Sequence, residues 1–191
     1  MNRITVAEGE RGMKEVTLNA THNYRYFSKM KGQGKSPLQV NVKDAATGLL
    51  GGFITIFTLI LLTMATSSEW LMAPFGASCV LAFGIWNAPF SQPRNIIGGH
   101  LVSSLIGILA YQWFGTTSWA MGLAVGLAIA VMMLTKTTHP PAGADPIVIM
   151  LGHMGWGYLL SPVLIGSIVI VVFALIVNNL RRDRAYPTFW R

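Results

Sequence analysis

Charged positions are almost absent from the middle of the chain. Residues 44–180 contain five charged side chains, and the whole chain of 191 residues is 11% charged and 52% hydrophobic. A soluble domain has about 25% charged residues, so this pattern excludes a soluble fold. Four apolar stretches, 44–66, 96–114, 118–135 and 158–180, are each close to the ~20 residues that a helix needs to cross ~30 Å of hydrocarbon. The pattern predicts an all-α integral membrane protein.

Two further apolar stretches are short or interrupted. Residues 70–86 carry Pro74 and Gly76, and residues 138–152 carry Pro140, Pro141, Gly143 and Pro146. If both stretches cross, the chain has about six transmembrane segments. With a cytoplasmic N-terminus, Arg94, Lys136 and Arg181 then lie on the cytoplasmic side, as the positive-inside rule expects. If both dip in and return, four segments remain and Arg94 and Lys136 face outward. Six segments with both termini cytoplasmic is the preferred topology, and the four-segment alternative stays open.

The two interrupted stretches resemble each other. One contains PFGAS (74–78) and the other PAGAD (141–145). Each follows one long stretch and precedes another, so the block 44–180 divides into repeat 1 (44–114) and repeat 2 (118–180). Three spans in each unit give the units opposite orientations, which makes a 3+3 inverted repeat. Inverted repeats with discontinuous helices are typical of secondary transporters.

The residues at the breaks predict an anion site. Ser78 and Asp145 are N-cap types, and Pro146 suits a first helical turn. We therefore expect a half-helix to begin near each cap, with free backbone N–H groups facing the membrane midplane, where they would bind an anion. The backbone predicted to bind substrate includes Gly76, Ala77, Gly143 and Ala144. Two alternatives stay open: the breaks are kinks only, or Asp145 is protonated and couples proton movement to transport.

Several other residues inside the block have expected roles. Arg94 either anchors the topology or stands at the mouth of an anion path, where Asn95 adds a donor. His100 is a functional candidate or a hydrogen-bond partner of a broken helix. His139 is expected to bind substrate, relay protons or stabilise the turn. Small residues spaced four apart are expected to pack helices closely; they are Gly99, Ser103 and Gly107, Gly48 and Gly52, and Gly122 and Gly126.

Other classes of function find no support in the sequence. Cys79 is the only cysteine, which excludes a disulfide framework and a cysteine-rich metal site. No zinc-enzyme spacing, Walker loop or nucleophile elbow is present, so no cofactor, metal or enzymatic activity is expected. The net charge of +7 arises mainly at the ends, with eight of the fourteen basic residues in 1–43 and four in 181–191. Such flanks are typical of cytoplasmic tails that touch membrane lipid, and no nucleic-acid partner is expected.

Three ordered motifs resemble those of the HPP family of small integral membrane proteins. They are APFGASCVLAF (73–83), SQPRNIIGGHL (91–101) and THPPAGADPI (138–147). The resemblance covers roughly residues 40–182 and implies nothing about residues 1–39. It implies a role in nitrite transport, with which some chloroplast and cyanobacterial members are associated. Carried over by motif, the positions of interest are Pro74, Gly76, Ala77, Ser78, Arg94, Asn95, His100, His139, Pro140, Pro141, Gly143, Ala144 and Asp145.

The resulting hypothesis is a transporter or channel for a small monovalent inorganic anion in a bacterial-type inner membrane. Nitrite is the first candidate, and the anion would bind between two opposed half-helix N-termini near the midplane. The glycine-rich faces favour a homo-oligomer. Two alternatives remain. The protein is a facilitator of another small solute, either a weak acid or a neutral molecule, or it is a non-transporting scaffold that binds a partner through residues 1–43.

Overall fold

The computed structural model describes Met30, Gly34, Ser36, residues 41–66 and residues 68–190. The chain forms two units, Met1–Gln39 and Val40–Arg191. Almost all of the first unit lies outside the described residues, and so does most of the predicted tail 1–43. The second unit contains the whole apolar block.

Every regular element in the described part of the chain is helical. In order, the elements are α1 (Val42–Thr66), α2 (Pro74–Cys79), η2 (Val80–Gly84), η3 (Pro89–Ser91), α3 (Pro93–Phe114), α4 (Ser118–Leu134), η4 (Pro140–Ala144), α5 (Asp145–Leu151), η5 (Leu159–Leu164) and α6 (Ile165–Asn179). The elements η2 and η5 are π-helical, and η3 and η4 are 3-10 turns. The predicted all-α integral membrane protein is confirmed.

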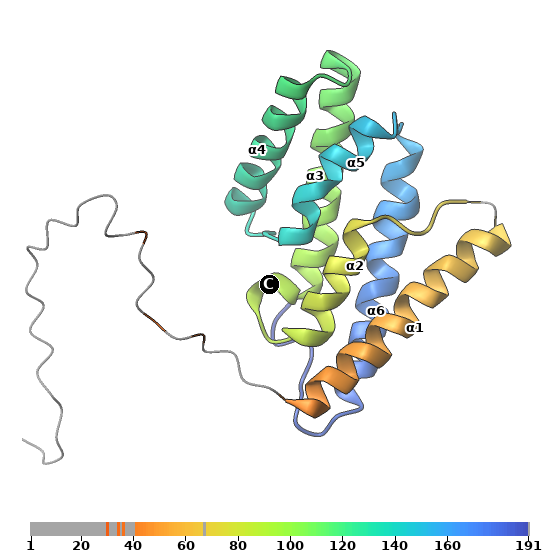
Figure 1. Cartoon of the computed structure of the whole chain (residues 1–191), viewed down its shortest axis with the longest axis vertical. Helices are drawn as coiled ribbons and strands as arrows, with labels where there is room; N and C mark the ends of the chain where they lie inside the picture. Colours follow the sequence, from red (N-terminus) through yellow and green to blue (C-terminus); the bar gives the residue numbers. More distant parts are fainter. Residues whose placement is uncertain (1–29, 31–33, 35, 37–40, 67, 191) are drawn as a thin grey trace, which may run out of the picture. The chain divides into compact units, whose positions relative to one another are not determined.

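Three helical stretches are long and apolar enough to cross a membrane, namely Val42–Thr66, Pro93–Phe114 and Leu159–Asn179. Pro74–Gly84 and Ser118–Leu134 are shorter apolar helices. Consecutive segments alternate in direction along the vertical axis of Figure 1. The number of full crossings and the inverted repeat stay predictions, because length and composition alone establish neither.

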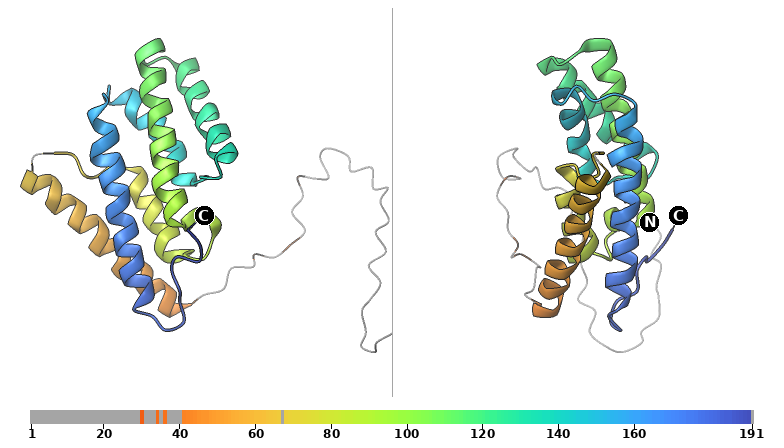
Figure 2. Two further views of the ribbon diagram at one scale, coloured as in Figure 1. Left: turned by 180° about the vertical axis from the view of Figure 1, so that it is seen from behind. Right: turned by 90° about the vertical axis from the view of Figure 1, so that its right-hand side faces the viewer.

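The two broken segments begin at the same depth of the bundle. In Figure 1, α2 starts near mid-height and runs down into η2, whereas α5 starts near mid-height and runs up. The full-length helices α3 and α6 pack against each other, and the start of the second broken segment, η4, contacts both α2 and α3. Both views of Figure 2 show the same central position for these starts. Residues at the two starts are therefore brought together inside the protein.

Prolines define where the helices begin and bend. Pro74, Pro93 and Pro140 each lie in a first helical turn, where a missing N–H leaves no hydrogen bond unmade. The predicted spanning stretch 158–180 corresponds to the candidate span Leu159–Asn179, which bends near its start. Ser161 has extended backbone angles (φ −133°, ψ 122°), because a residue before proline disfavours the helical region. The regular helix α6 begins only after this bend.

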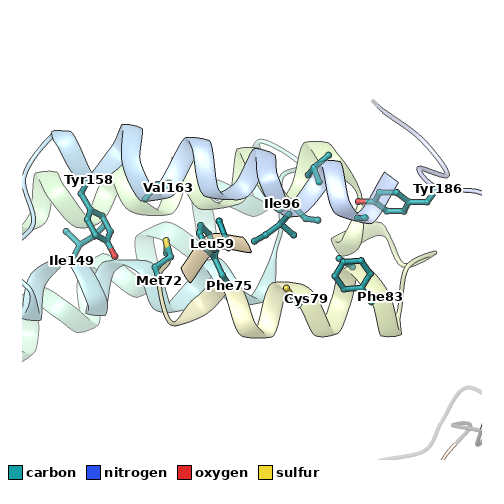
Figure 3. Packing of buried hydrophobic residues seen from close by; sticks show 14 of the residues in the cluster. Leu59, Met72, Phe75, Cys79, Phe83, Ile96, Ile149, Tyr158, Val163 and Tyr186 are labelled. Carbon is teal, nitrogen blue, oxygen red and sulfur yellow. The ribbon is translucent and has the colours of Figure 1, made fainter. Parts of the chain in front are cut away.

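Apolar side chains fill the space between the broken first segment and α6. Figure 3 shows Met72, Phe75 and Phe83 on one side of this core and Val163 on the other, with Leu59 of α1 between them. The exposed side of α1 is also apolar, and only 17% of the most apolar 18-residue stretch of this helix is buried. Exposed leucines and phenylalanines are expected on such a surface because the solvent there is hydrocarbon.

The small-residue faces have different roles. A Cβ at Gly99 would lie 2.6 Å from His139 Cβ, and one at Gly107 would lie 2.8 Å from Pro146 Cα. Close packing is therefore confirmed for this face of α3, which holds the second broken segment. The other four predicted positions, Gly48, Gly52, Gly122 and Gly126, have no neighbour within 4 Å of an added Cβ in this chain. The expected homo-oligomer stays a prediction.

The basic C-terminal segment is fastened to the helix ends. The Arg184 side chain is buried, and its guanidinium donates to Phe83 O (2.8 Å), Asn178 Oδ1 (2.6 Å) and Asp44 Oδ1 (2.6 Å). The Tyr186 hydroxyl donates to Ser91 O over 2.7 Å. Residues 181–190 thus connect the start of α1, the end of the first broken segment and the end of α6 through hydrogen bonds. The sequence predicted only a tail for these residues.

Replacing Arg184 with Lys should lower the free energy of unfolding by about 2 kcal/mol, because an ammonium cannot reach three separated acceptors as a guanidinium does. Arg182→Lys is the matched control, since Arg182 is exposed, and it should change stability by less than about 0.5 kcal/mol. Thermal unfolding in detergent micelles measures both. Equal effects would contradict a structural role for the C-terminal segment.

A buried polar cluster between the two broken segments

Ser78 is the centre of a buried hydrogen-bonded cluster. Its Oγ lies 2.9 Å from His100 Nε2 and 2.9 Å from His139 Nε2. All three side chains are 0% exposed. Ser78 belongs to α2, His100 to α3, and His139 directly precedes η4. The cluster therefore links the first broken segment to the second across a full-length helix.

His100 extends the cluster to Asp145. Its Nδ1 lies 2.8 Å from Asp145 Oδ2, and the Ser104 hydroxyl donates to the same oxygen over 3.1 Å. The Asp145 side chain is also 0% exposed. Its other oxygen, Oδ1, has no hydrogen-bond partner within the described structure. A carboxyl group so enclosed is costly unless its charge is neutralised by a partner or by protonation.

Two groups fix the orientation of the imidazoles. His139 Nδ1 lies 2.7 Å from Phe90 O and must donate, because a carbonyl oxygen carries no hydrogen. The Phe75 ring stands edge-on to His100, with ring centroids 5.1 Å apart and an interplanar angle of 86°. The two imidazoles are themselves 5.0 Å apart, centroid to centroid. A carbonyl on one side and an aromatic ring on the other thus hold the cluster in one arrangement.

The predicted N-cap role of Asp145 is wrong. Ala144 occupies the cap position of α5 with no side-chain hydrogen bond, and Asp145 is the first residue of the helix. The reason is that the 3-10 turn of η4 leads directly into α5, so no extended cap residue is needed. The Asp145 carboxyl group is directed to α3 instead.

Ser78 is also not an N-cap. The helix α2 begins at Pro74, and Ser78 lies near its end. The first N–H groups are not free as predicted: Phe75 N–H donates to Met72 O (3.0 Å) and Gly76 N–H donates to Ala73 O (3.3 Å). The turn before the helix supplies these acceptors. The chemistry at the centre therefore belongs to side chains, with little contribution from exposed backbone.

Arg94 and Asn95 hold the turn that leads to His139. Arg94 Nη2 donates to Thr135 O over 2.9 Å, and Asn95 Nδ2 donates to Thr138 O over 2.9 Å. Both carbonyls lie between the end of α4 and His139. These two predicted site residues support the cluster from one side and do not contact it.

The small residues predicted to bind substrate do not line the cluster. Gly76, Ala77 and Ala144 are exposed and Gly143 is half-buried. A Cβ added at Gly76 or Gly143 meets nothing within 4 Å. Gly76 instead borders an open groove of about 430 Å³ between α1 and the first broken segment. The predicted set thus separates into Ser78, His100, His139 and Asp145 at the centre and the rest around it.

Two serines of the site were not predicted. Ser104 bonds Asp145, and the Ser103 hydroxyl donates to Ala142 O over 2.6 Å. Ser103 was predicted only as part of a packing face, and no role was predicted for Ser104. The signal that was available is spacing, because Ser104 follows His100 by four residues and so shares its face of the helix.

The atoms of Ser78, His100 and Asp145 have the connectivity of a hydrolase triad. Three features differ from a hydrolase. Ser78 lies inside a helix instead of on a strained turn, its oxygen has a second imidazole partner, and its side chain is 0% exposed. No group of three or more His, Cys, Asp or Glu is placed to hold a metal ion within the described residues. What the cluster can do chemically is hold protons and pass them along hydrogen bonds.

The comparisons with known proteins identify the family of this chain. Residues 37–187 match the model of the HPP transmembrane region. The chain belongs to the HPP transmembrane family. The three HPP motifs converge on this cluster, since they supply Ser78, His100, and His139 with Asp145. The His of the His-Pro-Pro motif is explained by its two bonds, to Phe90 and to Ser78, and the two prolines form the 3-10 turn that follows it.

Two related proteins are transmembrane proteins of Dictyostelium discoideum. One is 38% identical over 178 residues, which cover 87% of this chain and 57% of the relative. The other is 32% identical over 180 residues, which cover 87% of this chain and 63% of the relative. The chain thus spans about three fifths of the length of these relatives. No solved structure matches.

Replacing Ser78 with Ala should lower the free energy of unfolding by about 2–3 kcal/mol, because two buried imidazole nitrogens lose their partner. Ser103→Ala is the matched control. It removes one donor from a single carbonyl and should cost about 1 kcal/mol. Chemical unfolding of both variants in micelles measures the difference. Equal losses would show that Ser78 does not bridge the two histidines.

Proposed function

We propose that the protein is a transporter or channel that moves a small monovalent inorganic anion across a membrane, with nitrite as the first candidate. The observation that carries this proposal is the buried polar cluster at the meeting point of two half-length segments. Ionisable residues inside a membrane protein are costly and usually mark an ion or substrate path. Discontinuous helices whose breaks meet at mid-depth are typical of transporter binding sites.

Because the helices α2 and α5 do not begin with free backbone N–H groups at Ser78 and Asp145, we place the anion site at side chains instead of at backbone N–H groups. Imidazole N–H groups of His100 and His139 and the Ser78 hydroxyl are the donors available to an oxyanion. The cluster is enclosed on all sides, so only a small substrate fits between these groups after a modest movement. This argues for an ion of a few atoms and against a large organic solute.

One approach to the cluster lies on the Glu69 side. A cavity of about 430 Å³ is lined by Glu69, by Met72 and Ala73 just before α2, and by Val148 of α5. Phe75 follows these residues, and its ring stands edge-on to His100. We assign this cavity as the outer vestibule and Phe75 as the side chain that must move to admit substrate. In this proposal both chain ends are cytoplasmic and the two three-segment units form an inverted pair.

The two other hypotheses make different demands on the cluster. A facilitator of a neutral solute needs no ionisable groups at mid-depth, so the His100–Asp145 pair favours an anion or a weak acid. A scaffold that binds a partner through residues 1–43 needs no polar centre at all. Burying four ionisable or hydroxyl side chains in one place is costly. This cost favours a transporter over a scaffold, because only a transporter uses these groups.

Liposomes that contain the purified protein should take up nitrite faster than empty liposomes. His100→Gln should lower that uptake at least roughly tenfold, since it changes the central donor, and one buried hydrogen bond of about 1.4 kcal/mol corresponds to this factor. His153→Gln is the matched control, because His153 is an exposed residue that bonds the Tyr111 hydroxyl, and uptake should be unchanged. The proposal fails if neither nitrite, nitrate nor chloride enters faster than into empty liposomes.

A further inference from the structure

The direction of each hydrogen bond in the cluster fixes how many protons it holds. His139 Nδ1 donates to Phe90 O. The Ser78 hydroxyl lies between two Nε2 atoms and has one hydrogen to donate. As long as at most one of the two imidazoles is charged, Ser78 donates to one imidazole and accepts from the other. The remaining contact, between His100 Nδ1 and Asp145 Oδ2, needs a hydrogen of its own.

Two assignments satisfy all four contacts with the fewest protons. In the first, Ser78 donates to a neutral His139, His100 donates to Ser78, and one proton lies between His100 Nδ1 and Asp145 Oδ2. In the second, a charged His139 donates to Ser78, Ser78 donates to His100, and His100 donates to the Asp145 carboxylate. Both hold one proton more than two neutral imidazoles and a carboxylate, and both have zero net charge.

Removing that proton leaves a contact that cannot be a hydrogen bond. Two lone pairs would then face each other, either over 2.8 Å between His100 and Asp145 or over 2.9 Å between Ser78 and one imidazole. The cluster would also carry a buried negative charge. The neutral arrangement with the proton on Asp145 puts the least charge in this enclosed site. It also explains why Oδ1 has no partner, because an acid carbonyl is cheaper to leave unpaired than a carboxylate oxygen.

The cluster can accept one more proton without losing a contact. Both imidazoles then donate through Nε2 to Ser78 Oγ, and the Ser78 hydrogen turns to Pro74 O, which lies 3.3 Å away. His100 Nδ1 donates to the Asp145 carboxylate. The net charge of this form is +1, which is costly alone and becomes favourable when an anion lies beside it.

Neighbouring elements supply little that would compensate a charge here. The helices α4 and α6 contain no ionisable side chain. The first broken segment adds Cys79, and Tyr158 lies just before η5, which packs against α3. Arg94 of α3 uses its guanidinium on Thr135 O. The charge balance therefore rests on His100, His139, Asp145 and whatever ion enters.

We propose that the anion crosses together with one proton, which the Ser78–His100–His139–Asp145 cluster takes up as the anion binds and gives up as it leaves. This inference rests on the proposed function and adds its coupling ion. The proton comes from water on the side of entry and returns to water on the other side. The neutral cluster plus an anion and a proton stays neutral, so the whole cycle moves no net charge.

The test measures both ions in the same liposomes at alkaline pH, with the flux into empty liposomes subtracted. A trapped pH dye reports protons, nitrite is assayed directly, and valinomycin with potassium gradients sets the membrane potential. The expected result is one proton taken up for each nitrite and a nitrite flux that the potential does not change. Ser78→Ala should lower both fluxes at least roughly tenfold. The control is Ser167→Ala, a buried serine whose hydroxyl donates to Leu164 O, and it should keep both fluxes and their one-to-one ratio.

Each other outcome identifies what is wrong. Nitrite uptake without protons, or uptake driven by the membrane potential, overturns the coupling and leaves the proposed transport intact. Wild-type proton and nitrite fluxes in Ser78→Ala overturn the role of the cluster. No nitrite uptake above empty liposomes overturns the proposed function and this inference with it.

Discussion

The hydroxyl of Ser78, held between the imidazoles of His100 and His139, is the contact on which the centre of this protein depends. The hydroxyl hydrogen can be donated to only one of the two nitrogens, and the other imidazole then donates to the oxygen, so the protonation of each histidine depends on the other. The two bonds join α2, α3 and the turn before η4. Side chains also satisfy backbone carbonyls at the second break, since Ser103 donates to Ala142 O and Asn95 donates to Thr138 O. A bundle with unbroken helices would have no such centre.

The surrounding structure is arranged to let these groups meet. Gly99 and Gly107 bring the second broken segment within van der Waals contact of α3, which puts His139 and Asp145 on either side of His100. Arg94 and Asn95 fix the turn before His139 through its carbonyls. At the end of the first broken segment, hydrogen bonds from Arg184 connect this segment to α1 and α6. Buried polar groups are costly without a hydrogen-bond partner, and these contacts supply most of the partners.

Hydropathy and breaker residues predicted much of this fold because the bilayer leaves few choices. Apolar stretches of sufficient length become helices, and prolines with glycines mark where two of them break. Capping was predicted wrongly, because the cap depends on how the chain enters the helix: a 3-10 turn precedes α5, and Pro74 starts α2 ahead of Ser78. The bend at Ser161 was not predicted, although the following Pro162 disfavours helical backbone angles at Ser161.

The site was predicted in its residue types and only partly in its geometry. His100, His139 and Asp145 stand out in an apolar chain, but only the folded structure shows that both histidines bond Ser78 and that Asp145 bonds His100. Ser104 was missed because a serine in an apolar helix reads as a packing residue. Arg184 was missed because a cluster of arginines after a span is usually solvated. In both cases the decisive partner is far away in sequence, as Asp145 is for Ser104 and Phe83 for Arg184.

In the resting cluster the net charge is zero and Asp145 carries the extra proton. Infrared difference spectroscopy of the purified protein, comparing the wild type with Asp145→Asn, can detect that proton. We expect a protonated carboxylic acid carbonyl band at neutral pH that shifts in heavy water and disappears in the variant. A carboxylate signal assigned to Asp145, with no acid band lost in the variant, would show that Asp145 is ionised and that the resting cluster is not arranged in this way.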